Sequence, residues 1–255
     1  MAEKETRNNP KVLVEAVPEE LAKVADVVPI LKGRGARDAD NRDARLAAWV
    51  PKTAVGRAVK QGTLKDVDEI LSGGRRILEP EIVESLLPLE HELIEIGQAK
   101  GKFGGGKRRA WRTTQRKTME GNVVSFSAMA VVGDKNGHVG VGMGKGKETL
   151  PAREKAQRYA KLSIQKIERG CGHFDCSCSE PHSVPFIVEG KCGSVRIKLM
   201  PAPQGTGLVV GDEIKKILRL AGIRDAYGVT RGQTRTTFNA VKACFEALLK
   251  TRRSK

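Results

Sequence analysis

A short run of thiols and imidazoles is the part of this sequence best suited to holding a metal ion. Cys171, Cys176, Cys178 and His182 lie within twelve positions, and His173 offers a second imidazole. A tetrahedral zinc site takes four ligands of these types. The spacings of four, one and three intervening residues are not those of the common zinc fingers. The run therefore supports two interpretations, a structural zinc site on Cys171, Cys176, Cys178 and His182 or a polar linker with unbound thiols.

A basic, glycine-rich run at residues 98–118 is the part best suited to binding phosphate. It holds eight basic residues and no acid, and the rings of Phe103 and Trp111 can stack on unpaired bases. Alone in water such a run repels itself, so a polyanionic partner is the simplest explanation. We predict that RNA is bound by Lys100, Lys102, Lys107, Arg108, Arg109, Arg112, Arg116 and Lys117.

Part of this run, residues 101–107, resembles the phosphate-binding loop of nucleotidases. In that motif a Ser or Thr follows the lysine and holds magnesium, whereas here the next residue is Arg108. Two consecutive arginines also make a poor helix start, because positive charge opposes the helix dipole. The four histidines lie away from any recognised nucleophile context. We therefore expect a protein that is not an enzyme.

Glycine occupies every second position from Gly140 to Gly146. This pattern has two equal interpretations: a helix packed closely on a strand, or a close approach of RNA backbone. A helix is predicted to begin at Pro151, and helix N-termini attract phosphate. Four further residues join the predicted RNA-binding set: Lys145, Lys147, Arg153 and Lys155.

The elements that must position these residues divide the chain into five segments. They are an extended arm (1–45), a helical extension (46–96), a first compact unit (97–170), a Cys/His-rich linker (171–182) and a second unit (183–255). In the helical extension we expect helices near residues 63–71 and 80–93, with a break at Pro88. The arm contains three prolines, and we expect it to order against a partner or to stay mobile.

The two units read as small α/β sandwiches. In the first, strands at 123–132 and 138–144 flank a turn that contains Asn136-Gly137, and a basic helix follows at 151–168. In the second, strands at 184–189 and 194–200 precede helices at 211–221 and 236–250. The predicted fold class is therefore α+β.

The distribution of charge says more than the formal net charge of +16. Residues 1–96 hold 15 Lys+Arg against 18 Asp+Glu, whereas residues 97–255 hold 31 against 12. Such segregation is typical of nucleic-acid binding, although a basic surface can also serve solubility alone. No stretch approaches the ~20 apolar residues of a membrane helix, and no apolar signal region opens the chain. We expect a cytoplasmic protein without a disulfide framework or membrane partner.

Several stretches together resemble ribosomal small-subunit protein five, a universal family, in its archaeal and eukaryotic form and most closely in its archaeal type. The resemblance covers roughly residues 46–250 and rests on WVPKT (49–53), SFSA (125–128), VGDKNGHVG (132–140), GSVR (193–196), PAPQGTG (201–207) and LAGI (220–223). The combination is highly specific, whereas a single glycine turn is not.

This resemblance implies a double-stranded-RNA-binding-like domain followed by a domain with a left-handed β-α-β unit. It implies a structural role in the small ribosomal subunit, on ribosomal RNA near the point where messenger RNA enters and near the decoding region, with effects on assembly and accuracy. Residues 113–124 would reach into ribosomal RNA. Small-subunit proteins four and eight would be neighbours, with Gly207 and Lys215 at the contact with protein four. The Cys/His run gains nothing from the resemblance.

The rival interpretation is a free-standing double-stranded-RNA-binding regulator, or an RNA-modifying enzyme with such a module. An enzyme needs a further catalytic domain, and residues 183–255 carry no cofactor fingerprint. A free regulator would bind generic duplex RNA without a ribosome.

Overall fold

The computed structural model describes residues 44–99, 101, 108–174, 176, 178 and 180–253. The chain divides into two compact units, Met1–Ala48 and Trp49–Lys255, and all the elements below belong to the second. Except for its last two positions, the predicted arm at residues 1–45 lies outside the described residues.

The helical extension contains α3 (Ala54–Lys60), α4 (Val67–Ser72) and α5 (Pro80–Leu86). The carboxylate of Glu79 accepts hydrogen bonds from the backbone N–H groups of Lys52 and Thr53 and from the indole of Trp49. Helix α4 begins at Val67, after Asp66, and so starts later than the helix expected near residues 63–71. The second predicted helix ends at Leu86, because the residue before a proline disfavours the helical region.

After Pro88 the chain forms a strand, β1 (Glu90–Leu93), which the sequence did not predict. It joins an antiparallel sheet with β2 (Trp111–Thr118), β3 (Gly121–Gly133), β4 (His138–Gly146) and β5 (Gln165–Lys166). The strand order is β1-β3-β4-β5, and β2 pairs with β3. The two predicted strands and the turn between them are present as β3 and β4. The turn is held by Asp134, whose Oδ1 accepts from the N–H groups of Asn136 and His138.

Helix α6 (Thr149–Leu162) covers one face of this sheet and is shorter than the helix expected at 151–168. The alternate glycines of β4 explain how closely it packs. A Cβ atom on Gly142 would lie 2.1 Å from the backbone nitrogen of Ala160, and one on Gly144 would lie 2.3 Å from the carbonyl oxygen of Ala152. Of the two interpretations of these glycines, close helix packing is the one the structure supports.

The second sheet has the order β6-β7-β9-β8. Its strands are β6 (Val188–Cys192), β7 (Val195–Pro201), β8 (Leu208–Val209) and β9 (Ala226–Arg231). Helix α7 (Asp212–Ala221) connects β8 to the parallel strand β9, which makes a β-α-β unit. Helix α8 (Thr237–Leu249) packs on β6, where a Cβ on Gly190 would lie 2.0 Å from the carbonyl oxygen of Ala243. The α+β fold class is confirmed.

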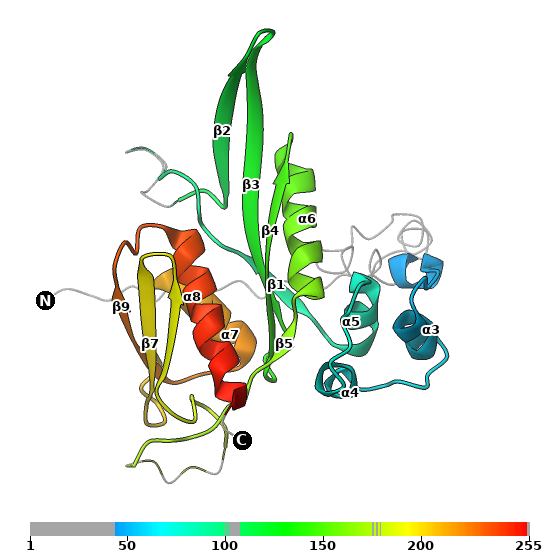
Figure 1. Ribbon diagram of the computed structural model, residues 1–255. Coiled ribbons are helices and arrows are strands. Elements are labelled where there is room, and N and C mark those ends of the chain that lie inside the picture. Colours follow the sequence, from blue (N-terminus) through cyan, green and yellow to red (C-terminus); the bar gives the residue numbers. More distant parts are fainter. Residues whose placement is uncertain are drawn as a thin grey trace, which may run out of the picture. The chain divides into compact units, whose positions relative to one another are not determined.

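The two sheets share one hydrophobic core and are not independent sandwiches. Along β3, Ala128, Ala130 and Val132 face α6, whereas Met129 and Val131 join a cluster with residues of α7, α8 and β7. Figure 1 shows α6 on one side of the first sheet and α7 and α8 on the other. Alternate residues of one strand therefore serve two different cores. This arrangement fixes the second sheet against the first.

Candidate nucleic-acid interface and metal centre

The β2–β3 hairpin is the most exposed part of the described first sheet. Figure 1 shows it rising past the other strands and past the end of α6. All of β2 after Trp111 is exposed, and Met119 in the turn has a fully exposed side chain. Side chains alternate between the two faces of a strand. Arg112 and Arg116 are four residues apart and therefore lie on the same face of the ribbon, whereas Lys117 lies on the other face. The hairpin thus presents cations on both faces.

The second half of the basic, glycine-rich run at residues 98–118 is a strand, because β2 begins at Trp111. Just before it, Arg108 pairs with Ala99 in an isolated antiparallel bridge, and Arg109 exchanges backbone hydrogen bonds with Gly97 and Gln98. Both arginine side chains are exposed at the base of the hairpin. Of the predicted RNA-binding residues, Lys100, Lys102 and Lys107 lie outside the described part of the chain, as does Phe103.

Trp111 and Arg153 form a contact that sequence reasoning missed. The guanidinium carbon of Arg153, in α6, lies 4.5 Å from the centre of the Trp111 ring, within cation–π range. Among the described atoms, the buried Nε of Arg153 has no hydrogen-bond partner. One face of the indole is therefore covered by protein. This contact joins the base of the hairpin to α6.

Three of the predicted cations gather where β4 passes into α6. Lys145, Lys147 and Lys155 are all exposed. The N-terminus of α6 begins after Glu148, which makes no side-chain capping hydrogen bond, and its first turn contains no acid. Free N–H groups at a helix N-terminus and nearby lysines both favour a phosphate.

A second basic surface, which sequence reasoning did not include, lies on the solvent face of the second sheet. Lys191, Arg196 and Arg231 occupy one cross-strand row, because Arg196 pairs with Lys191 on β6 and with Arg231 on β9. All three side chains are exposed. Like charges directly opposite each other destabilise a sheet, so the row is suited to a polyanion that neutralises it. The alternation of apolar and basic residues at 195–199 indicates which side chains face solvent. Which residues of neighbouring strands lie beside them can be known only from the strand register.

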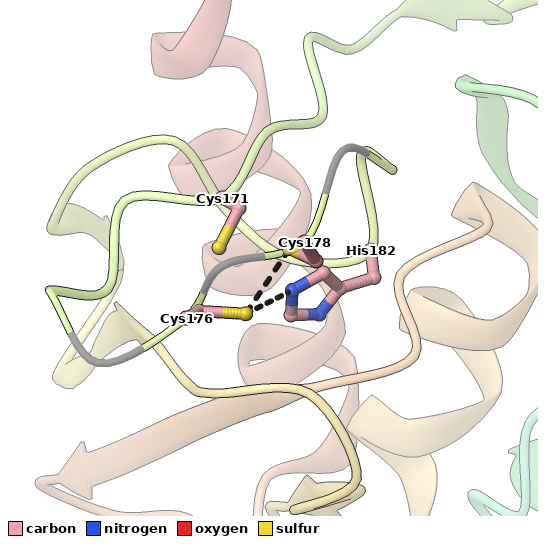
Figure 2. Close-up of side chains that lie close together, drawn as sticks. All are labelled: Cys171, Cys176, Cys178 and His182. Carbon is pink, nitrogen blue, oxygen red and sulfur yellow. Dashed lines mark hydrogen bonds between the residues drawn. The ribbon is translucent and has the colours of Figure 1, made fainter.

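The four predicted metal ligands converge in space. The three thiol sulfurs and one imidazole nitrogen of Cys171, Cys176, Cys178 and His182 all lie within 4.8 Å of one another. Figure 2 shows the side chains turned toward a common centre. The Sγ of Cys176 lies 3.0 Å from that of Cys178 and 3.4 Å from Nε2 of His182. Of the two imidazoles that the run offers, His182 is the one in the group.

The protonation of the thiols follows from their contacts. The hydrogen bond between the two thiols of Cys176 and Cys178 lowers the pKa of Cys176 to about 6, and backbone N–H groups add to this effect. The same contact raises the pKa of Cys178 to about 12. Thiolates are the metal-binding form of cysteine, and a cation among them favours deprotonation of every thiol that it binds.

The predicted protein-contact residues lie beside this cluster. Gly207 has a φ of +73°, and its N–H donates to Oδ1 of Asp225 at 2.7 Å. Lys215, in α7, is half-buried and pairs with Asp212 at 3.4 Å. Lys215, Leu208 and His182 line one cavity of about 750 Å³, and its other cations include Arg219 and Arg224. This cavity is open and basic.

None of the described helices is both long and apolar enough to cross a membrane. Residues 110–168 match the N-terminal domain of ribosomal protein S5, and residues 190–255 match its C-terminal domain. The protein named small ribosomal subunit protein uS5 in Nanoarchaeum equitans is 52% identical over 206 residues, which cover 80% of this chain and 88% of that protein. Its namesake in Aeropyrum pernix is 48% identical over 209 residues, covering 82% and 89%. That of Methanococcus maripaludis strain C6 is 46% identical over 211 residues, covering 82% and 86%.

Proposed function

This chain belongs to the ribosomal protein S5 family, and on that premise we propose that its β2–β3 hairpin and basic surfaces hold small-subunit ribosomal RNA near the messenger-RNA path and the decoding region. Its role is structural, in the small ribosomal subunit, and it is not an enzyme. It binds ribosomal RNA and other ribosomal proteins in that particle, in the cytoplasm.

The β2–β3 hairpin is the observation that carries the proposal. A two-stranded ribbon with polar side chains on both faces gains little stability from burial, so its projection from the sheet is best explained by a partner. Arg112, Arg116 and Lys117 can neutralise phosphates on either side, and the exposed side chains of Met119 and Val123 offer apolar contact to bases. A narrow basic ribbon of this kind suits insertion between RNA segments.

The other cations extend the proposed contact over two more surfaces. Lys145 and Lys147 precede α6 and Lys155 lies in its second turn, and the row of Lys191, Arg196 and Arg231 crosses the second sheet. Because the two sheets share a core, these surfaces are held at fixed positions relative to each other. Binding of several RNA segments to one rigid protein would fix those segments and so assist subunit assembly.

Contact with small-subunit protein four is proposed at Gly207 and Lys215. The open, basic cavity bordered by Leu208 and Lys215 supports a polar docking surface there. Changes at such a contact would alter decoding accuracy if the two proteins separate or rearrange during decoding. Protein eight and messenger RNA are proposed as neighbours from the family alone.

The proposal is tested by equilibrium binding of the full chain to small-subunit ribosomal RNA of a related archaeon and to a generic RNA duplex. The hairpin variant carries Arg112→Ala, Arg116→Ala and Lys117→Ala. The matched control removes three exposed cations of the helical extension, Lys65, Arg75 and Arg76.

We expect the wild-type chain to prefer ribosomal RNA. The hairpin variant should bind more weakly, with a salt slope lower by ~3, whereas the control should match the wild type. Equal affinity for any duplex, unaffected by the hairpin substitutions, would support the free-standing regulator instead.

A further inference from the structure

We propose that Cys171, Cys176, Cys178 and His182 bind one structural zinc ion, and that this ion fixes the Gly207 turn through Asp225. The ion itself requires no RNA contact and does not rest on the proposed function. Only the use of the Gly207 turn as a contact with small-subunit protein four rests on it. Three thiolates and one imidazole are the soft donor set that selects zinc, and four protein ligands close its coordination shell.

The distances between the ligand atoms lie on either side of those around a tetrahedral zinc ion. Zinc–sulfur bonds of about 2.3 Å and zinc–nitrogen bonds of about 2.0 Å place neighbouring ligand atoms about 3.5 to 3.8 Å apart. The separation of 3.4 Å between Cys176 Sγ and His182 Nε2 is close to this value. The contact of 3.0 Å between Cys176 and Cys178 must widen by about 1 Å. The other separations are all within 4.8 Å, so none has to shorten by more than about 1 Å.

The described part of the loop that carries the ligands has no hydrophobic core of its own. Gly170 and Ser183 close its base through two backbone hydrogen bonds of 2.9 Å each. Between them, none of the described residues from 171 to 181 is buried, and Phe174 is fully exposed. A loop without a core of its own needs another source of stability, and a bound metal supplies it. The four ligand side chains converge (Figure 2), so a zinc ion bound by them would stabilise the loop.

His182 is already oriented as a metal ligand. Its Nδ1 lies 2.8 Å from Oδ2 of Asp225, and both side chains are buried. This contact favours the proton on Nδ1 and leaves the lone pair of Nε2 directed at the thiols. The carbonyl oxygen of His182 accepts from the N–H groups of Arg224 and Asp225, which fixes the backbone as well. A carboxylate behind the histidine is the usual outer partner of a zinc ligand.

Asp225 carries the effect of the ion beyond the loop. One of its oxygens faces His182 and the other accepts the Gly207 N–H at 2.7 Å. Ser183, next to the ligand His182, also holds this region, since its hydroxyl accepts the N–H of Ala202 at 3.2 Å. Loss of the ion would let the His182 side chain move. This would weaken its contact with Asp225, which is one of the two side-chain contacts that orient Asp225. The turn at residues 203–207 would then open more often.

The first test measures zinc bound to the full chain after purification without chelators. We expect about one zinc per chain in the wild type. Cys176→Ser and Cys178→Ser should each lose most of it, whereas the control Cys192→Ser, outside the cluster, should keep it. Cobalt(II) added to the zinc-free wild-type chain should give the visible spectrum of a tetrahedral thiolate site. A wild-type chain without zinc, cysteines joined as a disulfide, or unchanged zinc in both variants would overturn the site.

The second test follows hydrogen exchange of the wild-type chain with zinc and after its removal. We expect faster exchange of peptides that cover residues 171–183 and 201–208, and unchanged exchange in α8. Asp225→Asn should weaken zinc affinity about tenfold or more, because the outer carboxylate orients the ligand. If exchange at residues 201–208 is the same with and without zinc, the link from the ion to Gly207 is wrong. These readouts need no RNA, so they separate failure of the zinc site from failure of the proposed function.

Discussion

The imidazole Nε2 of His138, in β4, lies 2.9 Å from Oδ1 of Asp68, in α4, and this contact joins the helical extension to the first sheet. The other ring nitrogen of His138 lies 2.6 Å from Asp134, the residue that holds the β3–β4 turn. Lys166 also pairs with Asp68. Hydrogen bonding to Asp134 raises the pKa of His138, although burial opposes the shift. For Asp68, burial opposes the shift, but hydrogen bonds from Lys166 and His138 lower the pKa.

These shifts predict how stability depends on pH. Because the pKa of His138 is raised in the folded state, its contribution is complete below the ordinary value of 6.5 and is lost as the pH rises through the folded-state pKa. Asp68 and Asp134 contribute above their ordinary value of 3.8 and cease to do so as the pH falls through their lowered pKa values. We expect His138→Gln to cost about 1 to 3 kcal/mol at about pH 6 and less at about pH 9. Urea unfolding at both pH values checks this; an equal loss at both would contradict it.

Gly142→Ala should destabilise the packing of α6 on the first sheet. Its added methyl would lie 2.1 Å and 2.4 Å from backbone atoms of Ala160 and Ala156, and backbone cannot move aside without displacing α6. We expect a loss of about 3 kcal/mol in the free energy of unfolding, at the upper end of overpacking effects. The control is Gly101→Ala, where an added Cβ meets no described atom within 4 Å. Similar unfolding midpoints for the two variants would show that β4 and α6 are not packed as described.

Arg196→Thr should raise protein stability and weaken RNA binding. The substitution removes the central cation from the row with Lys191 and Arg231, and a β-branched residue suits the strand. Relief of the repulsion should stabilise the chain by about 0.5 kcal/mol. Incorporation into small subunits should fall in competition with the wild type. A variant that is more stable and still competes equally would show that this row does not bind RNA.

Gly207→Arg should leave the fold intact and alter decoding accuracy. An added Cβ meets no described atom within 4 Å, so the cost is backbone strain of about 1 kcal/mol from the left-handed conformation. Gly205 has a φ of +88° and equally open surroundings, which makes Gly205→Arg a matched control for strain and charge. A readthrough reporter in assembled ribosomes should respond to Gly207→Arg and much less to Gly205→Arg. Equal readthrough in both would remove Gly207 from the protein contact.

The parts of the fold predicted from the sequence are those with strong local patterns. Strands β3 and β4, the turn at Asp134 and the amphipathic helices α6, α7 and α8 follow from alternation, turn residues and apolar spacing. Strands β1 and β2 escaped prediction because no apolar alternation marks them. Residues 112–118 are polar on both faces, and only pairing with β3 makes them a strand.

The candidate sites likewise contain residues that a local sequence pattern identifies and residues that only the fold brings together. All four metal ligands could be named from one short run, because their types carry the signal. Asp225 could not, since it lies 43 positions from His182 and reaches it only through the fold. The row of Lys191, Arg196 and Arg231 likewise depends on the register of three strands.

Sedimentation of the tagged full-length chain from cell lysate through a sucrose gradient tests the central claim most directly, at low and at moderate salt. A structural protein of the small subunit should migrate with that subunit at both salt concentrations, because many phosphate contacts and shared protein surfaces hold it. A chain that stays in the light fractions at both concentrations would contradict the account and would favour an RNA-binding protein that acts outside the ribosome.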